Sequence, residues 1–262
     1  MIKKVVCFLA ALIIPGCKNN NEQVKKDVHT YLNQTYKESF EINKIKRLMN
    51  EGNGITNTYE LLCTPKSDES LTFAAIAGYN ASEKKYKVTF DKYRTLLVRE
   101  VAKKQLQPLV EKHYDKFDMA LSFVNSLATF QNEDITIHQP INYEALVKKA
   151  GKKWYSQLSF AIFENPEVNS EKHIDFIKDV YRFFAEKGHQ QLSIAIAFYP
   201  ANEYTQNTTY VKDIPNQLLA IYTNPQTITH RWRYELDQKG FSNLEATLKK
   251  LPEGIHMTPS KQ

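Results

Sequence analysis

The sequence predicts an α+β protein made of two helix-covered, mainly antiparallel sheet modules. Segments with helical spacing of apolar residues are mixed with segments in which apolar and polar residues alternate. Several alternating segments follow one another across short turns, as antiparallel strands do. Of the 262 residues, 42% are hydrophobic and 24% charged, which suits a folded protein and excludes disordered, collagen-like and disulfide-framework classes.

The first module is predicted over residues 22–118, in the order α-β-β-β-β-α. Val24, Val28 and Leu32 recur at four-residue spacing, which predicts an amphipathic helix over 22–37. Alternation and turn residues predict four strands and two turns, the strands at 40–49, 55–64, 71–77 and 86–90, and the turns at 50–54 and 78–80. Asp91 is expected to cap a helix that continues to about residue 117 and is kinked by Pro108.

The second module is predicted over residues 119–262, beginning with an apolar segment at 119–130 that fits either a strand or a helix. Alternation predicts strands at 135–138, 154–163, 191–199, 216–222 and 228–236. Helical spacing predicts helices at 142–149, 170–187 and 241–251. Gly188 stands where the longest of these helices should end.

The amino terminus has the pattern of a signal peptide. Lys3 and Lys4 precede an uninterrupted apolar run of ten residues, Val5–Ile14. Ten residues are too few to span a bilayer as a helix, which takes about 20, but they match the apolar region of a signal peptide. We therefore expect residues 1–16 to be removed.

Ile14-Pro15-Gly16-Cys17 resembles the lipobox of bacterial lipoproteins. This resemblance, which covers the leader alone, implies cleavage before Cys17 and attachment of fatty acyl chains such as palmitate to that residue. Residues 17–21 would then be a short tether. Lys18 after the cysteine favours the periplasmic leaflet of the outer membrane if the source is Gram-negative. The alternative is an ordinary secretory signal with a chance cysteine.

Charge and cysteine content restrict the partners. The net charge of +6 is spread over many lysine pairs, so we expect solvated surfaces and no nucleic-acid partner. The alternative is that some of these lysines are attracted to anionic lipid headgroups beside the anchor. Cys63 lies in an alternating segment with Tyr59 and Leu61 on the same face, which predicts a buried, unreactive thiol.

Common catalytic and metal-binding motifs do not occur in the sequence. It contains no nucleotide-binding loop, no serine-hydrolase elbow, no H-E-x-x-H and no C-x-x-C. None of the seven histidines has another histidine two to five residues away, and each is expected at the surface or half-buried. The sequence therefore predicts no catalytic residue, metal site or cofactor.

A candidate binding surface comes from aromatic and arginine residues near the carboxyl end. In the segment 230–235, Trp232 and Tyr234 alternate with Arg231 and Arg233. Several tyrosines that are expected to be exposed lie in the polar segment before it. Arginine, tryptophan and tyrosine dominate binding hot spots. The candidate residues are Tyr199, Tyr204, Tyr210, Arg231, Trp232 and Arg233. The alternative is that the aromatic residues pack in the core and the arginines are solvated.

Two functions fit these observations. The first is a membrane-anchored cell-envelope lipoprotein that binds a protein partner without catalysis, for example as an accessory or immunity protein. The second is an envelope-anchored enzyme acting on glycan, peptide or lipid through a site that no short motif marks. The missing motifs favour the first.

Overall fold

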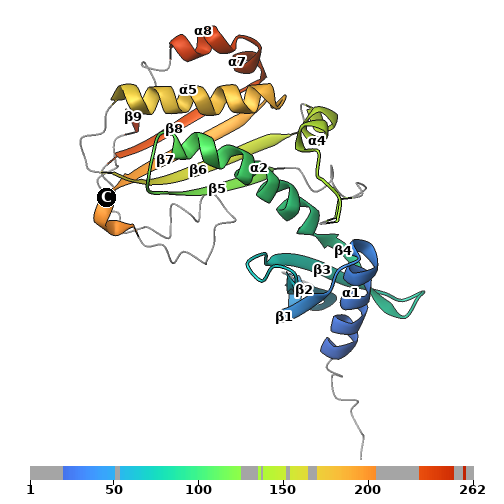
Figure 1. The fold of residues 1–262 in the computed structure, drawn as a ribbon. Helices are drawn as coiled ribbons and strands as arrows, with labels where there is room; N and C mark the ends of the chain where they lie inside the picture. The colour runs from blue at the N-terminus through green and yellow to red at the C-terminus, as the bar shows by residue number, and fades with distance from the viewer. Residues whose placement is uncertain are drawn as a thin grey trace, which may run out of the picture. The chain divides into compact units, whose positions relative to one another are not determined.

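The computed structural model describes residues 20–50, 54–124, 135–136, 138–151, 154–164, 170–204, 230–250 and 256–257. These residues divide into two compact units (Figure 1). The first unit runs to Ser67 and includes Ala74–Phe90, and the second contains Asp68–Phe73 and the chain from Asp91. One unit holds a four-stranded sheet and the other a five-stranded sheet, each accompanied by helices. The predicted α+β class with two sheet modules is confirmed.

The first unit is a helix followed by four strands. The elements are α1 (Asn21–Tyr36), β1 (Phe40–Asn50), β2 (Gly54–Pro65), β3 (Phe73–Asn80) and β4 (Lys85–Asp91). The four strands that the sequence predicted are present, and they neighbour one another in chain order. The turn predicted at 78–80 is wrong, because those residues complete β3 and the chain turns after them.

The helix and the sheet of the first unit share a core. Val24, Val28 and Leu32 of α1 are completely buried, and so are Leu61 and Cys63 of β2. The four-residue spacing on the helix and the two-residue spacing on the strand each place the apolar side chains on one face. The expectation that Cys63 is buried is confirmed.

The neighbouring residues Leu61 and Leu62 of β2 allow a test of which face of this strand lies in the core. Leu61 is fully buried, whereas Leu62 is 39% exposed on the opposite face. Leu61→Ala should lower the free energy of unfolding by about 2–5 kcal/mol, because it leaves a cavity in the core. Leu62→Ala should lower it by less than about 1 kcal/mol. Urea unfolding of both variants measures the difference, and equal losses would contradict the assigned faces.

The second unit is a mixed sheet with helices. Its elements are α2 (Tyr93–Glu111), β5 (Phe117–Val124), α4 (Tyr143–Ala150), β6 (Tyr155–Phe163), α5 (Ser170–Glu186), β7 (Leu192–Tyr199), the 3₁₀ turn η2 (Ala201–Glu203), β8 (His230–Leu236), α7 (Gln238–Ser242), α8 (Leu244–Lys249) and β9 (His256–Met257). The strand order is β5-β6-β7-β8-β9. β6 and β7 run parallel and are joined through α5, whereas the other pairs are antiparallel.

Helices α2 and α5 contact each other and lie over one face of this sheet (Figure 1). Phe176 of α5 contacts Phe160 of β6, with ring centres 5.0 Å apart. Tyr114, just after α2, contacts both Phe176 and Phe198 of β7, with ring centres at 5.0 and 6.2 Å. Aromatic packing of this kind forms the main core of the second unit.

The boundary between the units lies earlier than residue 118. Apart from the short segment Asp68–Phe73, the second unit begins at Asp91, because α2 packs against β5 and α5. The apolar spacing of α2 predicted a helix, but helical spacing does not say which sheet the apolar face will cover. The first unit therefore has the element order α-β-β-β-β, without the final helix that the sequence predicted.

Smaller differences also separate the predicted elements from the observed ones. Helix α2 ends at Glu111, with Pro108 inside its last turn. The described residues of 135–138 are not a strand. The predicted helix at 241–251 is two short helices that meet at Asn243. The apolar segment from residue 119 belongs to β5 as far as Val124. The predicted strand at 216–222 lies outside the described residues.

Candidate functional site

The sheet of the second unit has a second apolar cluster on the face opposite α5. Ala161 and Phe163 of β6 alternate with the residues that contact α5, and they form a buried cluster with Ala197 and Tyr199. The Phe163 and Tyr199 rings are stacked with centres 5.4 Å apart, and Tyr204 packs edge-on against Phe163 at 5.1 Å. This group is called the aromatic cluster below. It lies where the two parallel strands end.

The predicted surface residues divide between the two faces of this sheet. The register pairs Arg231 with Ala197 and Arg233 with Ala195, whereas Trp232 pairs with Ile196. Because directly paired residues share a face, positions 231 and 233 lie on the side of the aromatic cluster, and position 232 lies on the side of α5.

The tyrosines of the predicted surface differ in exposure. Tyr199 is 1% exposed, so it is a core residue at the end of β7 and not an exposed loop residue. Tyr204 is partly buried at the edge of the aromatic cluster. Tyr210 lies outside the described residues. The structure thus brings together Tyr199, Tyr204 and positions 231 and 233, and it separates them from position 232.

A polar cluster at the beginning of α5 was not predicted from the sequence. Lys172 forms an ion pair with Glu164 at 2.5 Å, and its Nζ lies 4.6 Å from the centre of the Tyr114 ring. The neighbouring His173 has its Nε2 3.0 Å from the hydroxyl of Tyr234 in β8. These residues lie toward the carboxyl ends of the parallel strands, where open α/β sheets bind ligands.

The phenols of this polar cluster are held neutral at neutral pH. Burial raises the pKa of Tyr234 to about 12. Burial, reinforced by the negative charge of Glu164, raises the pKa of Tyr114 above its ordinary value. A general acid or base works best with a pKa near the working pH. These two phenols are therefore hydrogen-bonding and packing groups, and they are poorly suited to proton transfer.

A buried network around His189 connects three elements of the second unit. The Tyr143 hydroxyl of α4 lies 2.6 Å from His189 Nε2, and Ser156 Oγ of β6 lies 3.0 Å from His189 Nδ1. Trp154 Nε1 donates to Ser156 Oγ at 3.1 Å. Burial lowers the pKa of His189 to about 3, so the imidazole is neutral and donates through one nitrogen while accepting through the other.

The Ser156–His189 contact has the residue types of a nucleophile and its base, but its surroundings argue for a structural role. Ser156 is fully buried, and its oxygen already accepts a hydrogen bond from Trp154. A pKa of about 3 makes His189 a weak base. We therefore assign this network to holding α4, β6 and the turn before β7 together.

The expectation that every histidine is exposed or half-buried is wrong for two of them. His173 and His189 are 2% and 3% exposed. His173 precedes the buried Ile177 and Tyr181 at helical spacing, so the apolar stripe of α5 could have indicated its burial. No such signal exists for His189, because its partners come from distant parts of the chain.

The His189 network predicts acid sensitivity. The pKa is about 3 in the folded protein and near 6.5 when unfolded, so the unfolded state binds more protons between these values. The contribution of the neutral His189 to the free energy of unfolding is fully present above pH 6.5 and is lost as the pH falls. Between pH 7 and pH 5 the loss should be about 2 kcal/mol, and His189→Gln should remove that part of the pH dependence.

Urea unfolding at pH 7 and pH 5 measures this effect. His29→Gln is the matched control for loss of an imidazole, because His29 is exposed on α1, and this variant should keep the part of the pH dependence that belongs to His189. An identical pH dependence in the parent and in His189→Gln would contradict the assignment.

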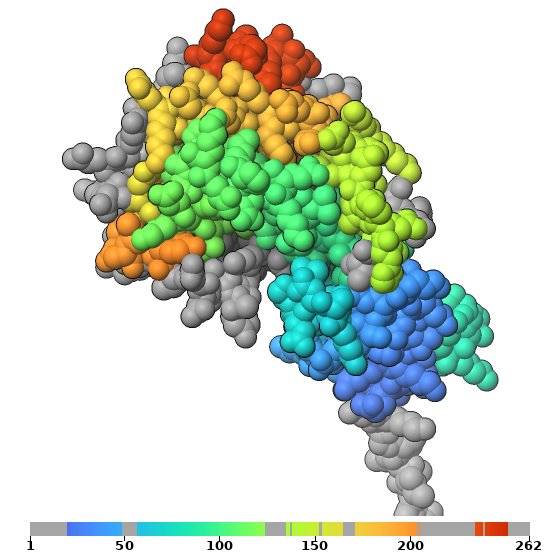
Figure 2. Space-filling model, viewed as in Figure 1, coloured from blue at the N-terminus to red at the C-terminus, as the bar shows by residue number. Residues whose placement is uncertain are grey.

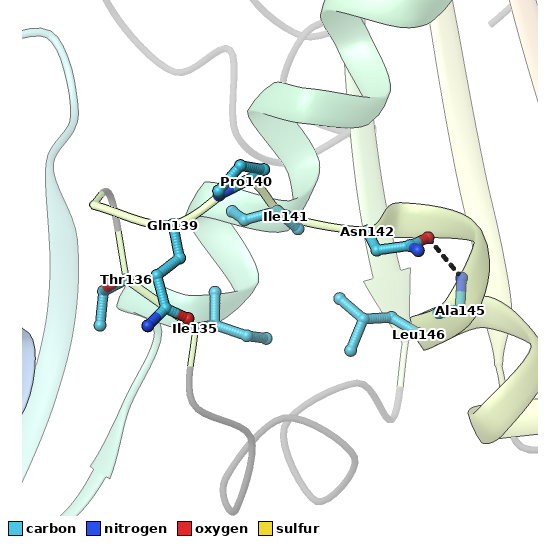
Figure 3. A pocket seen from close by; sticks show the side chains of 8 residues that line it. All are labelled: Ile135, Thr136, Gln139, Pro140, Ile141, Asn142, Ala145 and Leu146. Atoms are coloured by element: carbon cyan, nitrogen blue, oxygen red, sulfur yellow. Dashed lines mark hydrogen bonds between the residues drawn. The ribbon is translucent and has the colours of Figure 1, made fainter.

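An open hollow lies between α4 and the segment before it (Figure 3). Ile135, Ile141 and Leu146 line it, and Asn142 caps α4 by accepting from the Ala145 backbone N–H at 3.0 Å. Its volume of about 150 Å³ is below the roughly 300 Å³ at which ligand pockets of small molecules begin. Among the described residues no three His, Cys, Asp or Glu side chains are grouped to hold a metal ion.

Comparison with known proteins supports the fold and nothing finer. No protein-family model matches the sequence, and no curated protein matches it. Among solved structures, the chain is similar to a DUF5037 family protein from Ruminococcus gnavus, with 15% sequence identity and a TM-score of 0.54. The similarity covers 88% of this chain and 100% of that chain. None of the described helices is both long and apolar enough to span a bilayer.

Proposed function

We propose that this protein is a cell-envelope lipoprotein, anchored through acyl chains on Cys17, whose folded units bind a protein partner without catalysis. The observation that carries the proposal is the lipobox-like Ile14-Pro15-Gly16-Cys17, followed almost at once by the folded chain. Asn20, which precedes α1, comes three residues after Cys17, and three extended residues span at most about 11 Å. The anchor would hold the first unit close to the membrane.

A binding role is supported by the chemistry of the described polar clusters. His189 and Tyr234 have pKa values of about 3 and about 12, far from the range useful for proton transfer at neutral pH. Tyr204, at the edge of the aromatic cluster, and the arginine positions 231 and 233 on the same side of the sheet have the residue types of a protein-binding surface, whereas the other members of the cluster are buried. The outer membrane, on its periplasmic leaflet, is the expected location in a Gram-negative cell.

The anchor is tested by replacing its thiol. Cys17→Ser should abolish metabolic labelling with a fatty-acid analogue and release the protein from the membrane fraction, because the serine cannot accept the diacylglyceryl group. Cys7→Ser is the matched control, since Cys7 lies within the leader and its replacement should leave labelling intact. Retention of label in Cys17→Ser would contradict the anchor.

The binding surface is tested by recovering a partner from detergent-solubilised envelopes. Arg231→Ala combined with Arg233→Ala should reduce recovery of a stoichiometric partner at least tenfold, the loss expected from one hot-spot residue of about 2 kcal/mol. Lys178→Ala combined with Arg182→Ala removes equal charge from α5 and should have no effect. Equal loss in both double variants would contradict the assigned surface.

The alternative of an anchored enzyme has a clear signature in the same material. It requires turnover of an envelope glycan, peptide or lipid that survives the two arginine substitutions and is lost when one carboxylate, such as Glu164, is replaced. That result, together with no partner recovered, would reverse the proposal.

A further inference from the structure

The turn between β3 and β4 of the first unit carries exposed lysines. α1 ends beside β1, since the rings of Tyr36 and Phe40 are 5.9 Å apart. The first half of α1 meets the start of β4. There Asp27 accepts from the Tyr86 backbone N–H at 2.8 Å, and the Tyr86 hydroxyl is hydrogen-bonded to Asn20. The start of β4 therefore lies beside the first half of α1, and the turn between β3 and β4 is nearer to the beginning of this helix than to its end.

This turn has a defined shape. The Asn80 side-chain oxygen accepts from the backbone N–H groups of Ser82 and Glu83 at 3.1 and 3.2 Å. Lys84 follows with a φ of +51°, a left-handed conformation that completes the tight turn. Figure 2 shows the segment, in teal-green, projecting from the surface of the first unit. Its side chains are thus presented outward by local hydrogen bonds.

The charge of the turn is positive. Lys84, Lys85 and Lys87 are all exposed. Glu83 pairs with Lys85 at 2.9 Å and also with Lys87, and these ion pairs lower the pKa of Glu83. One carboxylate among three ammonium groups leaves the turn with net positive charge. Asp27 on α1 is the further acidic group that acts on Lys85.

Tyr79, near the end of β3, is exposed on the sheet face that also carries Tyr86, which is opposite the face of Lys85 and Lys87. Tyr79 is 43% exposed and packs edge-on against Tyr86, with ring centres 5.2 Å apart. Tyrosine and lysine are the residues that populate the boundary between a bilayer and water, because each has an apolar body and a polar tip.

We propose that the exposed lysines at this turn, Lys84, Lys85 and Lys87, contact the headgroups of an anionic lipid bilayer. The inference rests on the proposed anchor, which would hold Asn20 within about 11 Å of the acylated residue. A tethered surface meets its target at an effective concentration in the millimolar range, so a weak contact is populated. Each lysine near an anionic surface strengthens the contact about fivefold at physiological salt. The first unit is then oriented on the membrane as well as attached to it.

The test tethers the mature chain to vesicles and measures cleavage by trypsin. The chain beginning at Cys17 is coupled through that thiol to a maleimide lipid, while Cys63 is buried and should not react. Vesicles contain either phosphatidylcholine alone or phosphatidylcholine with phosphatidylglycerol. Cleavage after Lys84, followed by mass spectrometry, should be at least fivefold slower on the anionic vesicles. Cleavage after Lys149 on α4 should be equal on both.

Two double variants separate the contact from general attraction. Lys85→Gln with Lys87→Gln should restore equal cleavage after Lys84 on both vesicle types. Lys148→Gln with Lys149→Gln removes the same charge from α4 and should preserve the protection of Lys84. Thermal unfolding of each variant establishes that it folds.

The outcomes distinguish this inference from the proposed anchor. Equal cleavage after Lys84 on both vesicle types, or equal protection in the two double variants, would overturn the inference and leave acylation of Cys17 standing. If Cys17 is not acylated in cells but Lys84 is protected on the anionic vesicles, the lipid-binding lysines are supported and the proposed lipid anchor is overturned.

Discussion

The packing of α5 against the parallel pair β6 and β7 is the constraint on which the second unit depends. The helix connects the two strands, so its length and its apolar stripe determine how they pair. Phe176 is completely buried between Phe160 and Tyr114, and burial of a side chain of this kind stabilises a fold by about 1.5–3 kcal/mol. The same packing positions Lys172 and His173 at one end of the helix and His189 just beyond the other.

This packing also gives the sheet two unlike faces. One face is covered by α5 and α2, and it is lined by large aromatic and aliphatic side chains. The other has alanines and the aromatic cluster, with positions 231 and 233 beside it in the register. The residues of the aromatic cluster are buried as well, so both faces of the sheet carry apolar packing. The clusters of buried polar groups serve the packing, since their partners are neighbours in the fold and their pKa values lie far from neutrality.

The units have separate physical tasks in the proposed function. The first would carry the acylated thiol a few residues before α1, and it has exposed lysines at the turn between β3 and β4. The second offers the larger sheet and the candidate protein-binding side. In that proposal a short tether would limit the distance between the first unit and the anchor, and charges on the surface of the unit would then act on the headgroups at close range.

The sequence by itself determined the α+β class and most helices and strands, because a period of about 3.6 or of 2 is a local property of the chain. The burial of Cys63 follows from the same local period of two, and the lipobox-like segment is a run of four consecutive residues that needs no tertiary structure to recognise. The tertiary structure alone decided that α2 belongs to the second unit, that Tyr199 is in the core and that His189 meets Tyr143 and Ser156. Each of these depends on contacts between residues far apart in the sequence, and spacing along the chain carries no information about which distant surface an apolar or polar side chain will meet.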